Sequence, residues 1–491
     1  MEILIDILRF IGVLFLVLMI FNLMILVHEW GHFLAGRWRG LKIDRFQIWF
    51  GKPIWKTTHN GVQYGLGTIP AGGFVSLPQM VTMESIEGQV DEEEKKALPP
   101  ISPLDKIIVA FAGPLFSFFL AVAFAVLVWA VGKPVEEARG TTVIGQVAED
   151  SPAEKAGLEV GDKILYIDGQ QVKQFLGMTD SVMWAVIASK SDTLEVEIDR
   201  PGEGRMTIQV ERAPLDQKEV EGPWVVRAWS YLTSRPPFRT IGVGPMVSPV
   251  IAETLPNSPA ESLGLRTGDV ILSVGGNVVR QPRDVVEFDW QAGQSVEVVF
   301  RRGDDTLTET IVPRIPEIPE GNTDAKIGVK FDAAGVRTIV HENPLTQVKN
   351  SFRSIFATLN AVFSPKSDIG AGHLSGPVGI MGVYYDLFQH PDGWRLVMWF
   401  SVLLNVNLAI LNLLPFPVLD GGHIVMAILE WIRRKPLPIR VLEVVQTGFV
   451  LMLLGFMAFV TLKDVGDRTS RGGGAAQQEP AFLPLSESEN P

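Results

Sequence analysis

The chain has 491 residues, of which 47% are hydrophobic, and its formal net charge is −12. This length favours about three folded units, and a negative charge without any long basic segment argues against nucleic acid as a partner. The chain has no cysteine, so disulfides and thiolate metal ligands are excluded and any zinc must be held by His and carboxylate side chains.

Four apolar runs predict transmembrane helices, at residues 10–27, 107–131, 396–419 and 444–462. Each has 18 to 25 uncharged residues, enough to cross about 30 Å of hydrocarbon as a helix. A cleaved signal peptide is a poor interpretation of the first run, because it lacks a small-residue cleavage site and its front end is acidic. Lys and Arg gather after the first run and between the third and fourth, which predicts that both places are cytoplasmic and that the part from about 132 to 393 is extracytoplasmic.

The first apolar run ends in a His-Glu-x-x-His motif made by His28, Glu29 and His32. On a helix the two histidines lie one turn apart on one face, so both imidazoles can reach one zinc ion, with Glu29 beside them to take a proton from water. The alternative is a pair of helix histidines that hydrogen-bond to neighbouring groups. The run lies near the cytoplasmic end of its helix, at a depth where such groups need a hydrated cavity walled by protein.

A membrane-re-entrant β element is predicted at residues 45–79. Residues 46–50 and 61–69 look like strands, Asn60-Gly61 fits a tight hairpin turn, and residues 70–74 are expected to break the ladder. A free strand edge could pair with an unwound substrate strand. An ordinary surface hairpin is the alternative. Residues 80–103, with four consecutive acidic residues, predict a solvated cytoplasmic linker.

The extracytoplasmic part contains an internal repeat, since Ser151 to Val172 aligns without gaps on Ser258 to Val279. The shared text S-P-A-E-x-x-G-L-x-x-G-D-x-I-L resembles the signature of bacterial PDZ domains, which we place at residues 138–215 and 238–316. PDZ domains bind extended peptides by adding a strand to a sheet edge, and residues 242–245, ahead of the second copy, could supply the glycine-rich binding loop. An equally plausible role is a steric filter that decides which substrates reach the membrane.

Apolar residues recur at helical spacing over residues 340–364, which predicts an amphipathic helix on the outer membrane surface. A core-facing soluble helix would show the same pattern. Residues 470–491 are rich in Gly, Ser and Glu and are predicted to be a disordered tail.

The third membrane segment, residues 394–421, carries the second half of the candidate site. Pro415 and Pro417 unwind the helix, which is tolerated at this depth only beside a cavity or a protein partner, and Asp420 follows as an intramembrane carboxylate. Two histidines and one carboxylate leave a fourth tetrahedral position open for water. Asn412 is placed to hydrogen-bond the substrate backbone or the developing oxyanion, and His423 is a competing ligand candidate.

These motifs together resemble the site-2 protease family of intramembrane zinc metalloproteases, and more narrowly the bacterial regulator-of-sigma-E proteases. The resemblance implies that Zn²⁺ is held by His28, His32 and Asp420, that Glu29 is the base and that Asn412 contacts substrate. Residues 46–75 are similar to the family's membrane-re-entrant β element, which adds Gly72 and Gly73 as substrate-binding candidates. The acidic segment after Met80 departs from the more basic stretch expected there, which concerns the subfamily and substrate and not the chemistry.

The expected protein is therefore a multi-domain membrane protein: a four-transmembrane-helix bundle with a membrane-associated β-hairpin element and two extracytoplasmic PDZ domains, each a partly open β-barrel with helices. The first, second and fourth helices are placed at 1–36, 104–131 and 443–463. The expected function is an intramembrane zinc endopeptidase of a bacterial inner membrane, with its active site near the cytoplasmic side. By resemblance it cuts single-span partners such as anti-sigma factors and remnant signal peptides, with peptide ligands of the PDZ domains as further partners. A catalytically inert, membrane-anchored PDZ adaptor is the alternative, and a channel or transporter is less well supported because no repeat relates the spans.

Overall fold

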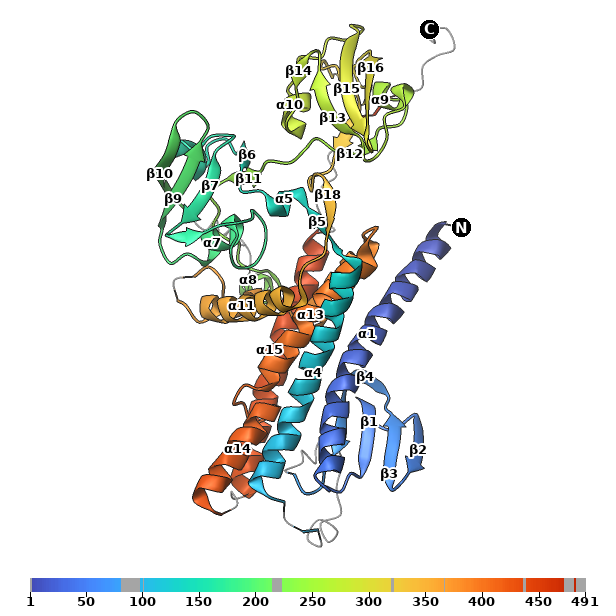
Figure 1. Cartoon of the computed structure of the whole chain (residues 1–491), viewed down its shortest axis with the longest axis vertical. Coiled ribbons are helices and arrows are strands. Elements are labelled where there is room, and N and C mark those ends of the chain that lie inside the picture. The colour runs from blue at the N-terminus through green and yellow to red at the C-terminus, as the bar shows by residue number, and fades with distance from the viewer. Residues whose placement is uncertain are drawn as a thin grey trace.

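The computed structural model describes residues 2–80, 98–99, 101–213, 223–318, 322–365, 367–435, 439–471 and 481–482. It contains four helices long and apolar enough to cross a membrane, in agreement with the four predicted spans: α1 (Glu2–Trp38), α4 (Pro103–Val131), α13 (Gly393–Asn412) and α15 (Ile439–Arg471). Two β units lie at the end of the bundle where α1 begins, and a small sheet packs beside α1 at the other end (Figure 1). The predicted linker at 80–103 falls mostly outside the described residues.

Helices α1 and α4 approach each other closely because small residues face the contact. A Cβ atom on Gly31 would lie 2.4 Å from the carbonyl oxygen of Ala112, so only glycine fits there. Helix α4 is capped at its N-terminus by Ser102, whose hydroxyl accepts a hydrogen bond from the backbone N–H of Asp105, and at its C-terminus by Gly132, which has a φ of 74°. The close approach brings the backbone of α4 within reach of the histidine side chains of α1.

The small sheet is made of β1 (Arg45–Phe50), β2 (Trp55–His59), β3 (Val62–Leu66) and β4 (Ile69–Ser76) in the order β2-β3-β1-β4. Positive φ angles of 50° at Asn60 and 80° at Gly61 join β2 to β3 by the predicted tight turn. Residues 70–74 lie within β4, and the prediction that they break the ladder holds for 70–72, which have no partner on β1, but is wrong for Gly73 and Phe74, which pair with Ile48 and Gln47. The irregularity is absorbed by a shift of register between Ile48 and Phe50.

A polar contact fastens this sheet to the first span. The indole N–H of Trp49 donates a hydrogen bond to Oδ1 of Asn22, the one polar residue of the first apolar run. Trp49 itself has a φ of 67°, a conformation that an aromatic residue rarely adopts. The end of β1 is therefore held against α1 at a cost in backbone strain, and β4 is placed next to the histidine motif.

The two β units repeat one arrangement. The elements of the first unit are β6 (Ile144–Val147), α6 (Pro152–Lys155), β7 (Lys163–Ile167), β8 (Gln170–Gln171), α7 (Val182–Ala188), β9 (Thr193–Arg200), β10 (Gly204–Glu211) and β11 (Val243–Pro245). Those of the second are β12 (Ile251–Thr254), α9 (Pro259–Leu263), β13 (Val270–Val274), β14 (Asn277–Val278), α10 (Pro282–Val286), β15 (Val296–Arg302), β16 (Asp305–Ile311) and β17 (Val329–Phe331). The sheet order of the first unit is β10-β9-β7-β8, and that of the second, read in the matching direction, is β16-β15-β13-β14, so the strands correspond one to one. Strand β11 pairs with β6 as β17 pairs with β12.

The predicted boundaries of both repeats need correction at their C-terminal ends. The core of the first unit includes Ile241, so this unit extends past residue 215, and the core of the second includes Ile327, past residue 316. The prediction that residues 242–245 serve the second copy is also wrong, because β11 pairs with β6 of the first unit. Each unit is closed by a strand that begins at the valine of an Ile-Gly-Val sequence, at 241–243 and at 327–329.

The remaining elements join the β units to the bundle. They are β5 (Lys133–Glu136), α5 (Glu137–Gly140), α8 (Trp224–Thr233), β18 (Arg337–Val340), α11 (Pro344–Val362), η1 (Ala371–His373), α12 (Pro377–Gln389) and α14 (Asp420–Arg433). Strand β5 leaves the bundle and pairs with β18, which returns to it. Helix α11 is the predicted amphipathic helix, and its Val348 and Ile355 pack against apolar side chains of α4 and α13. Helices α8 and α12 were not predicted.

The C-terminal residues do not all fit the predicted disordered tail at 470–491. Helix α15 continues to Arg471, and Ala481 forms a β-bridge with Ile318 of the second unit. The side chain of Phe482 is buried. The prediction is therefore wrong for these residues, because an aromatic side chain within the polar tail finds an apolar site on a folded unit. Residues 472–480 and 483–491 lie outside the described residues.

Candidate metal centre

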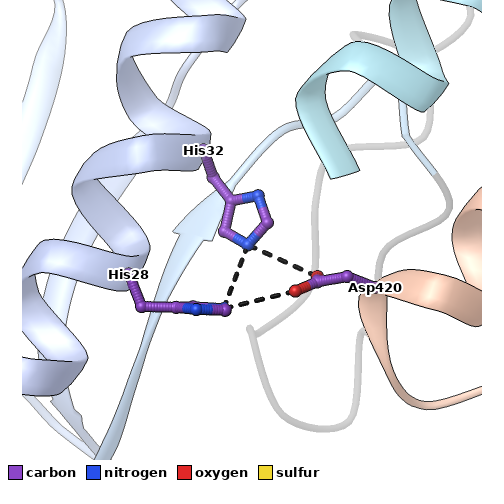
Figure 2. Close-up of side chains that lie close together, drawn as sticks. All are labelled: His28, His32 and Asp420. Carbon is purple, nitrogen blue, oxygen red and sulfur yellow. Dashed lines mark hydrogen bonds and ion pairs between the residues drawn. The ribbon is translucent and has the colours of Figure 1, made fainter. Parts of the chain in front are cut away.

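Three side chains from two distant parts of the chain converge at the end of the bundle away from the β units. His28 and His32 project from α1 toward Asp420, the first residue of α14 (Figure 2). Their Nε2 atoms lie 3.3 Å apart. Nε2 of His28 lies 3.2 Å from Oδ2 of Asp420, and Nε2 of His32 lies 3.3 Å from Oδ1. Among the described residues, this is the group of His and carboxylate side chains arranged to hold a metal ion.

The hydrogen bonds of the histidines show which atoms face the centre. Nδ1 of His32 lies 2.8 Å from the carbonyl oxygen of Val109, and because a carbonyl can only accept, Nδ1 carries the proton. In the neutral imidazole Nε2 then presents a lone pair to Asp420. Nδ1 of His28 lies 2.9 Å from the hydroxyl of the fully buried Ser117. Both partners belong to α4, which thus orients the two rings in the way that outer-shell groups orient metal ligands.

This arrangement fits a bound cation. The Nε2 lone pair of His32 faces a carboxylate oxygen of Asp420 at 3.3 Å, which is repulsive unless a positive charge lies between them, and Nε2 of His28 lies within 3.3 Å of both partners. Oδ2 of Asp420 is buried and accepts no hydrogen bond from the described residues. Zinc bonds of about 2.0–2.1 Å in a tetrahedron place neighbouring ligand atoms roughly 3.3–3.4 Å apart. The observed separations match that value.

The position of Asp420 depends on the break between α13 and α14. Helix α13 ends at Asn412, and the chain then turns through the two prolines before α14 starts at Asp420. A Cβ atom on Gly421 would lie 2.3 Å from the carbonyl oxygens of Leu413 and Leu414, and one on Gly422 would lie 2.1 Å from that of Phe416. The Asp-Gly-Gly sequence is therefore required, because only glycines let α14 begin so close to the preceding turn.

A cavity of about 420 Å³ opens beside these three side chains. Its lining includes the other predicted site residues: Glu29, Gly72, Gly73, Asn412 and His423. Gly73 lies so close to α1 that a Cβ atom there would be 3.5 Å from Cγ of Glu29. The structure thus brings all the predicted residues to one cavity, while His423 lines the wall outside the group of three.

The sequence analysis missed the contribution of α4. A Cβ atom on Gly113 would lie 2.2 Å from Nε2 of His32 and 2.9 Å from Nε2 of His28, so α4 passes directly against the ligand atoms. Ser117 follows one helical turn later. The available signals were Gly113-Pro114 and a single hydroxyl in an otherwise apolar span, but neither points to a metal without the three-dimensional contact.

Comparison with known proteins gives consistent results. The sequence profile of peptidase family M50 matches residues 14–456. The chain is 28% identical to protease RseP of Yersinia pestis over 455 residues, covering 88% of this chain and 94% of that protein. It is also 28% identical to the regulator of sigma-E protease RseP of Escherichia coli over 455 residues, with coverage of 88% and 94%. A Vibrio cholerae protein described as a zinc metalloprotease is 28% identical over 446 residues, with coverage of 86% and 91%.

Among solved structures, the PDZ domain of the SdrC-like protein of Listeria monocytogenes is similar to part of this chain. The identity is 20% and the TM-score 0.15, and the match covers 17% of this chain and 87% of that one.

A His-Glu-x-x-His helix that meets an aspartate inside a bundle of membrane-spanning helices defines a membrane-embedded metalloprotease. The family profile covers most of the chain. The chain belongs to peptidase family M50. This confirms the predicted resemblance to site-2 proteases and to the regulator-of-sigma-E type, and with it the expectation of an intramembrane metallopeptidase.

Proposed function

We propose that this protease is a zinc endopeptidase that cuts peptide bonds within or near the transmembrane segment of single-span membrane proteins. One observation carries the proposal: three lone-pair donors converge at the edge of a cavity that also contains Glu29, between helices long enough to span a membrane. The name of the Vibrio cholerae relative supports zinc as the metal. His28, His32 and Asp420 would hold the ion.

The catalytic roles follow from the places of the remaining side chains. A zinc ion held by these side chains would supply an acidified water molecule and Lewis-acid polarisation of the scissile carbonyl. Glu29, next to His28 on α1 and facing the same cavity, accepts the proton of the attacking water and returns one to the leaving amine. Asn412, at the end of α13 on the same cavity wall, donates a hydrogen bond to the substrate backbone or to the oxyanion.

Strand β4 offers a place for the substrate. A transmembrane helix shields its carbonyls in hydrogen bonds, so the substrate must be unwound before hydrolysis. Strand β4 is at the edge of its sheet, and its Gly72 and Gly73 line the catalytic cavity. An unwound substrate segment would add to this edge as a further strand, which holds its backbone extended beside the ligands. Only glycine fits at position 72 of this edge, because its φ is 73° and a Cβ atom there would lie 2.1 Å from the ring of Phe50.

The substrate class and location are taken from the relatives. Several relatives, including the Escherichia coli protein, bear names that link them to regulation of sigma-E, which favours anti-sigma factors as substrates, with remnant signal peptides as a second group. We place the protein in a bacterial inner membrane, with the β units outside and the metal centre toward the cytoplasm. This orientation agrees with the place of α14, which begins at Asp420, at the end of the bundle opposite the β units (Figure 1).

We infer that both β units are PDZ domains, because they share one repeated sequence and one strand order. Peptide binding and steric filtering of substrates are both compatible with their place at the end of the bundle. We place the first PDZ domain from β6 to β11 and the second from β12 to β17.

The Glu29→Gln variant tests the proposed chemistry. It keeps the three metal ligands, so purified protein should hold one zinc per chain, while cleavage of a model single-span substrate should fall by at least about a thousandfold because the proton acceptor is lost. Glu443→Gln, on the exposed surface of α15, is the matched control and should cleave normally. Full cleavage by Glu29→Gln would refute the assigned base. A wild-type protein without zinc and without cleavage of any single-span substrate would support the inert adaptor instead.

A further inference from the structure

The second β unit carries a socket for an aromatic side chain, and the socket is filled by the chain's own C-terminal segment. Phe482 retains only 3% of its accessible surface. A Cβ atom on Gly328 would lie 2.8 Å from Cε2 of Phe482 and 2.3 Å from Cβ of Ser258, so the ring lies directly against the Ile-Gly-Val sequence that leads into β17. The guanidinium of Arg314 lies 5.9 Å from the ring centroid. We call the site formed by Asn257, Ser258, Arg314, Ile318 and Gly328 the Phe482 socket.

Backbone contacts hold the segment next to the ring. The N–H of Ala481 donates to the carbonyl oxygen of Ile318 at 3.0 Å, and the N–H of Ile318 donates back at 3.2 Å. Nδ2 of Asn257 donates to the carbonyl oxygen of Phe482 at 3.3 Å. An antiparallel backbone pair combined with a buried anchor side chain is the pattern by which folded domains bind extended peptides.

The first β unit has the same local fold but lacks one part of this site. A Cβ atom on Gly242 would lie 2.3 Å from Cβ of Ser151, the same distance as between a Cβ atom on Gly328 and Cβ of Ser258. Asp150 occupies the position of Asn257, with φ angles of 56° and 58°. A carboxylate cannot donate a hydrogen bond to the peptide carbonyl and would face its oxygen. The segment is thus matched to the second unit and not to the first.

The chain geometry permits docking within one molecule. Helix α15 ends at Arg471 on the side of the bundle where the β units lie (Figure 1). Ala481 is ten residues further along the chain, and ten extended residues reach at most about 35 Å. A tether of this length keeps the segment at a high local concentration around the unit.

We propose that the Phe482 socket is a peptide-binding site for an extended segment with a small residue followed by an aromatic one, and that the chain's own C-terminal segment occupies it in cis. The docked segment ties the second unit to α15 and competes with any other peptide for the socket. The proposal does not depend on the metal centre, since none of its residues lies in the catalytic cavity.

Cysteine crosslinking tests the docking, because the chain contains no cysteine of its own. Residues that exchange both backbone hydrogen bonds have Cα atoms about 5.5 Å apart, which suits a disulfide. The full chain with Ala481→Cys and Ile318→Cys should form an intrachain disulfide under mild oxidation and migrate as a monomer. The control pair Ala481→Cys with Val278→Cys, on β14 at the opposite edge of the sheet from β16, should not.

Single changes in the socket distinguish specific docking from random encounter. Phe482→Ala or Asn257→Asp should slow intrachain crosslinking by about tenfold or more, whereas Asp150→Asn in the first unit should leave the rate unchanged. Crosslinking at the same rate in Phe482→Ala, or no crosslinking at all, would overturn the proposal. Disulfides found only between two chains would show that a second copy, and not the cis segment, is the occupant.

A labelled peptide of residues 478–486 provides the second measurement. It should bind the full-length Phe482→Ala variant, whose socket is vacated, and bind wild type at least about tenfold more weakly because the cis segment competes. Zinc content and cleavage of a model substrate should be normal in both proteins, which shows that they are folded. Equal binding to both, or equal binding of a peptide with alanine in place of the phenylalanine, would rule out a competed aromatic socket.

Discussion

The replacement of Gly113 by alanine tests the claim that α4 organises the metal centre. The added Cβ atom would lie 2.2 Å from Nε2 of His32, whereas real Cβ atoms stay beyond 3.0 Å of such neighbours. The ring must therefore move by at least 3.0 − 2.2 = 0.8 Å. Its hydrogen bond to the carbonyl of Val109 opposes rotation, and the contact of Gly31 with Ala112 opposes separation of the helices.

The size of the effect follows from the narrow tolerance of metal coordination. Ligand distances in functional sites stay within about 0.2 Å of their usual values, so a displacement of 0.8 Å removes one ligand from its bonding position. We expect zinc affinity to fall by about 100-fold or more, equivalent to about 2.7 kcal/mol. Alanine favours a helix over glycine by about 1 kcal/mol, so a loss of this kind would not come from weaker helix formation.

The measurement is zinc binding by competition with a chelator of known affinity, together with metal content of the purified protein. Gly455→Ala is the matched control, because Gly455 also lies in a membrane-spanning helix but has open space where its Cβ would stand. The Gly113→Ala protein should still purify as a folded monodisperse protein. Wild-type zinc affinity in this variant would refute the contact between α4 and the ligands.

Two further changes probe contacts that the sequence motifs do not reveal. Ser117→Ala removes the hydroxyl 2.9 Å from Nδ1 of His28 and should weaken zinc binding by roughly 10- to 100-fold without unfolding. Ser351→Ala, at a buried hydroxyl of α11 that bonds its own helix, should leave zinc binding unchanged, and equal effects of the two would contradict the assignment. Asp464→Asn weakens a buried carboxylate that accepts from the N–H groups of Gly376 and Gly379 and from Arg235. It should cost about 2 kcal/mol and lower Tm by at least about 3 °C, whereas Asp386→Asn, in an exposed pair with Arg468, should change Tm by less than about 1 °C.

The parts of the fold that the sequence predicts are those whose signal is local and strong. Long uncharged runs predicted the four membrane-spanning helices, because nothing else permits so many apolar side chains in sequence. The dipeptide Asn60-Gly61 predicted its hairpin, since both positions need a positive φ. The prolines and Asp420 of the third segment predicted a helix break next to a carboxylate, and α13 does end before it.

The errors arise where distant segments decide the structure. Residues 70–74 look like a ladder break because they contain proline and two glycines, but the break covers only 70–72, since pairing with β1 resumes at Gly73 and Phe74. The ends of the repeats were placed too early because the closing strands β11 and β17 follow irregular segments and gain their partners only in the folded unit. Phe482 lies in a polar tail, and only the socket on the second unit explains its burial.

Helix α4 supplies none of the three side chains of the candidate centre, but its contacts bring residues 28, 32 and 420 together. The His-Glu-x-x-His motif sets two ligands one helical turn apart, and the broken third segment supplies a carboxylate, but neither motif contains information on their separation. Helix α4 contacts both sides, since Val109 and Ser117 bond the histidine rings and Lys106 pairs with Glu430 of α14 at 2.6 Å. Gly113 lets this helix pass against the ligand atoms. In a membrane the hydrophobic effect does not drive helices together, so these close and polar contacts of α4 are what hold the two halves of the centre at bonding distance.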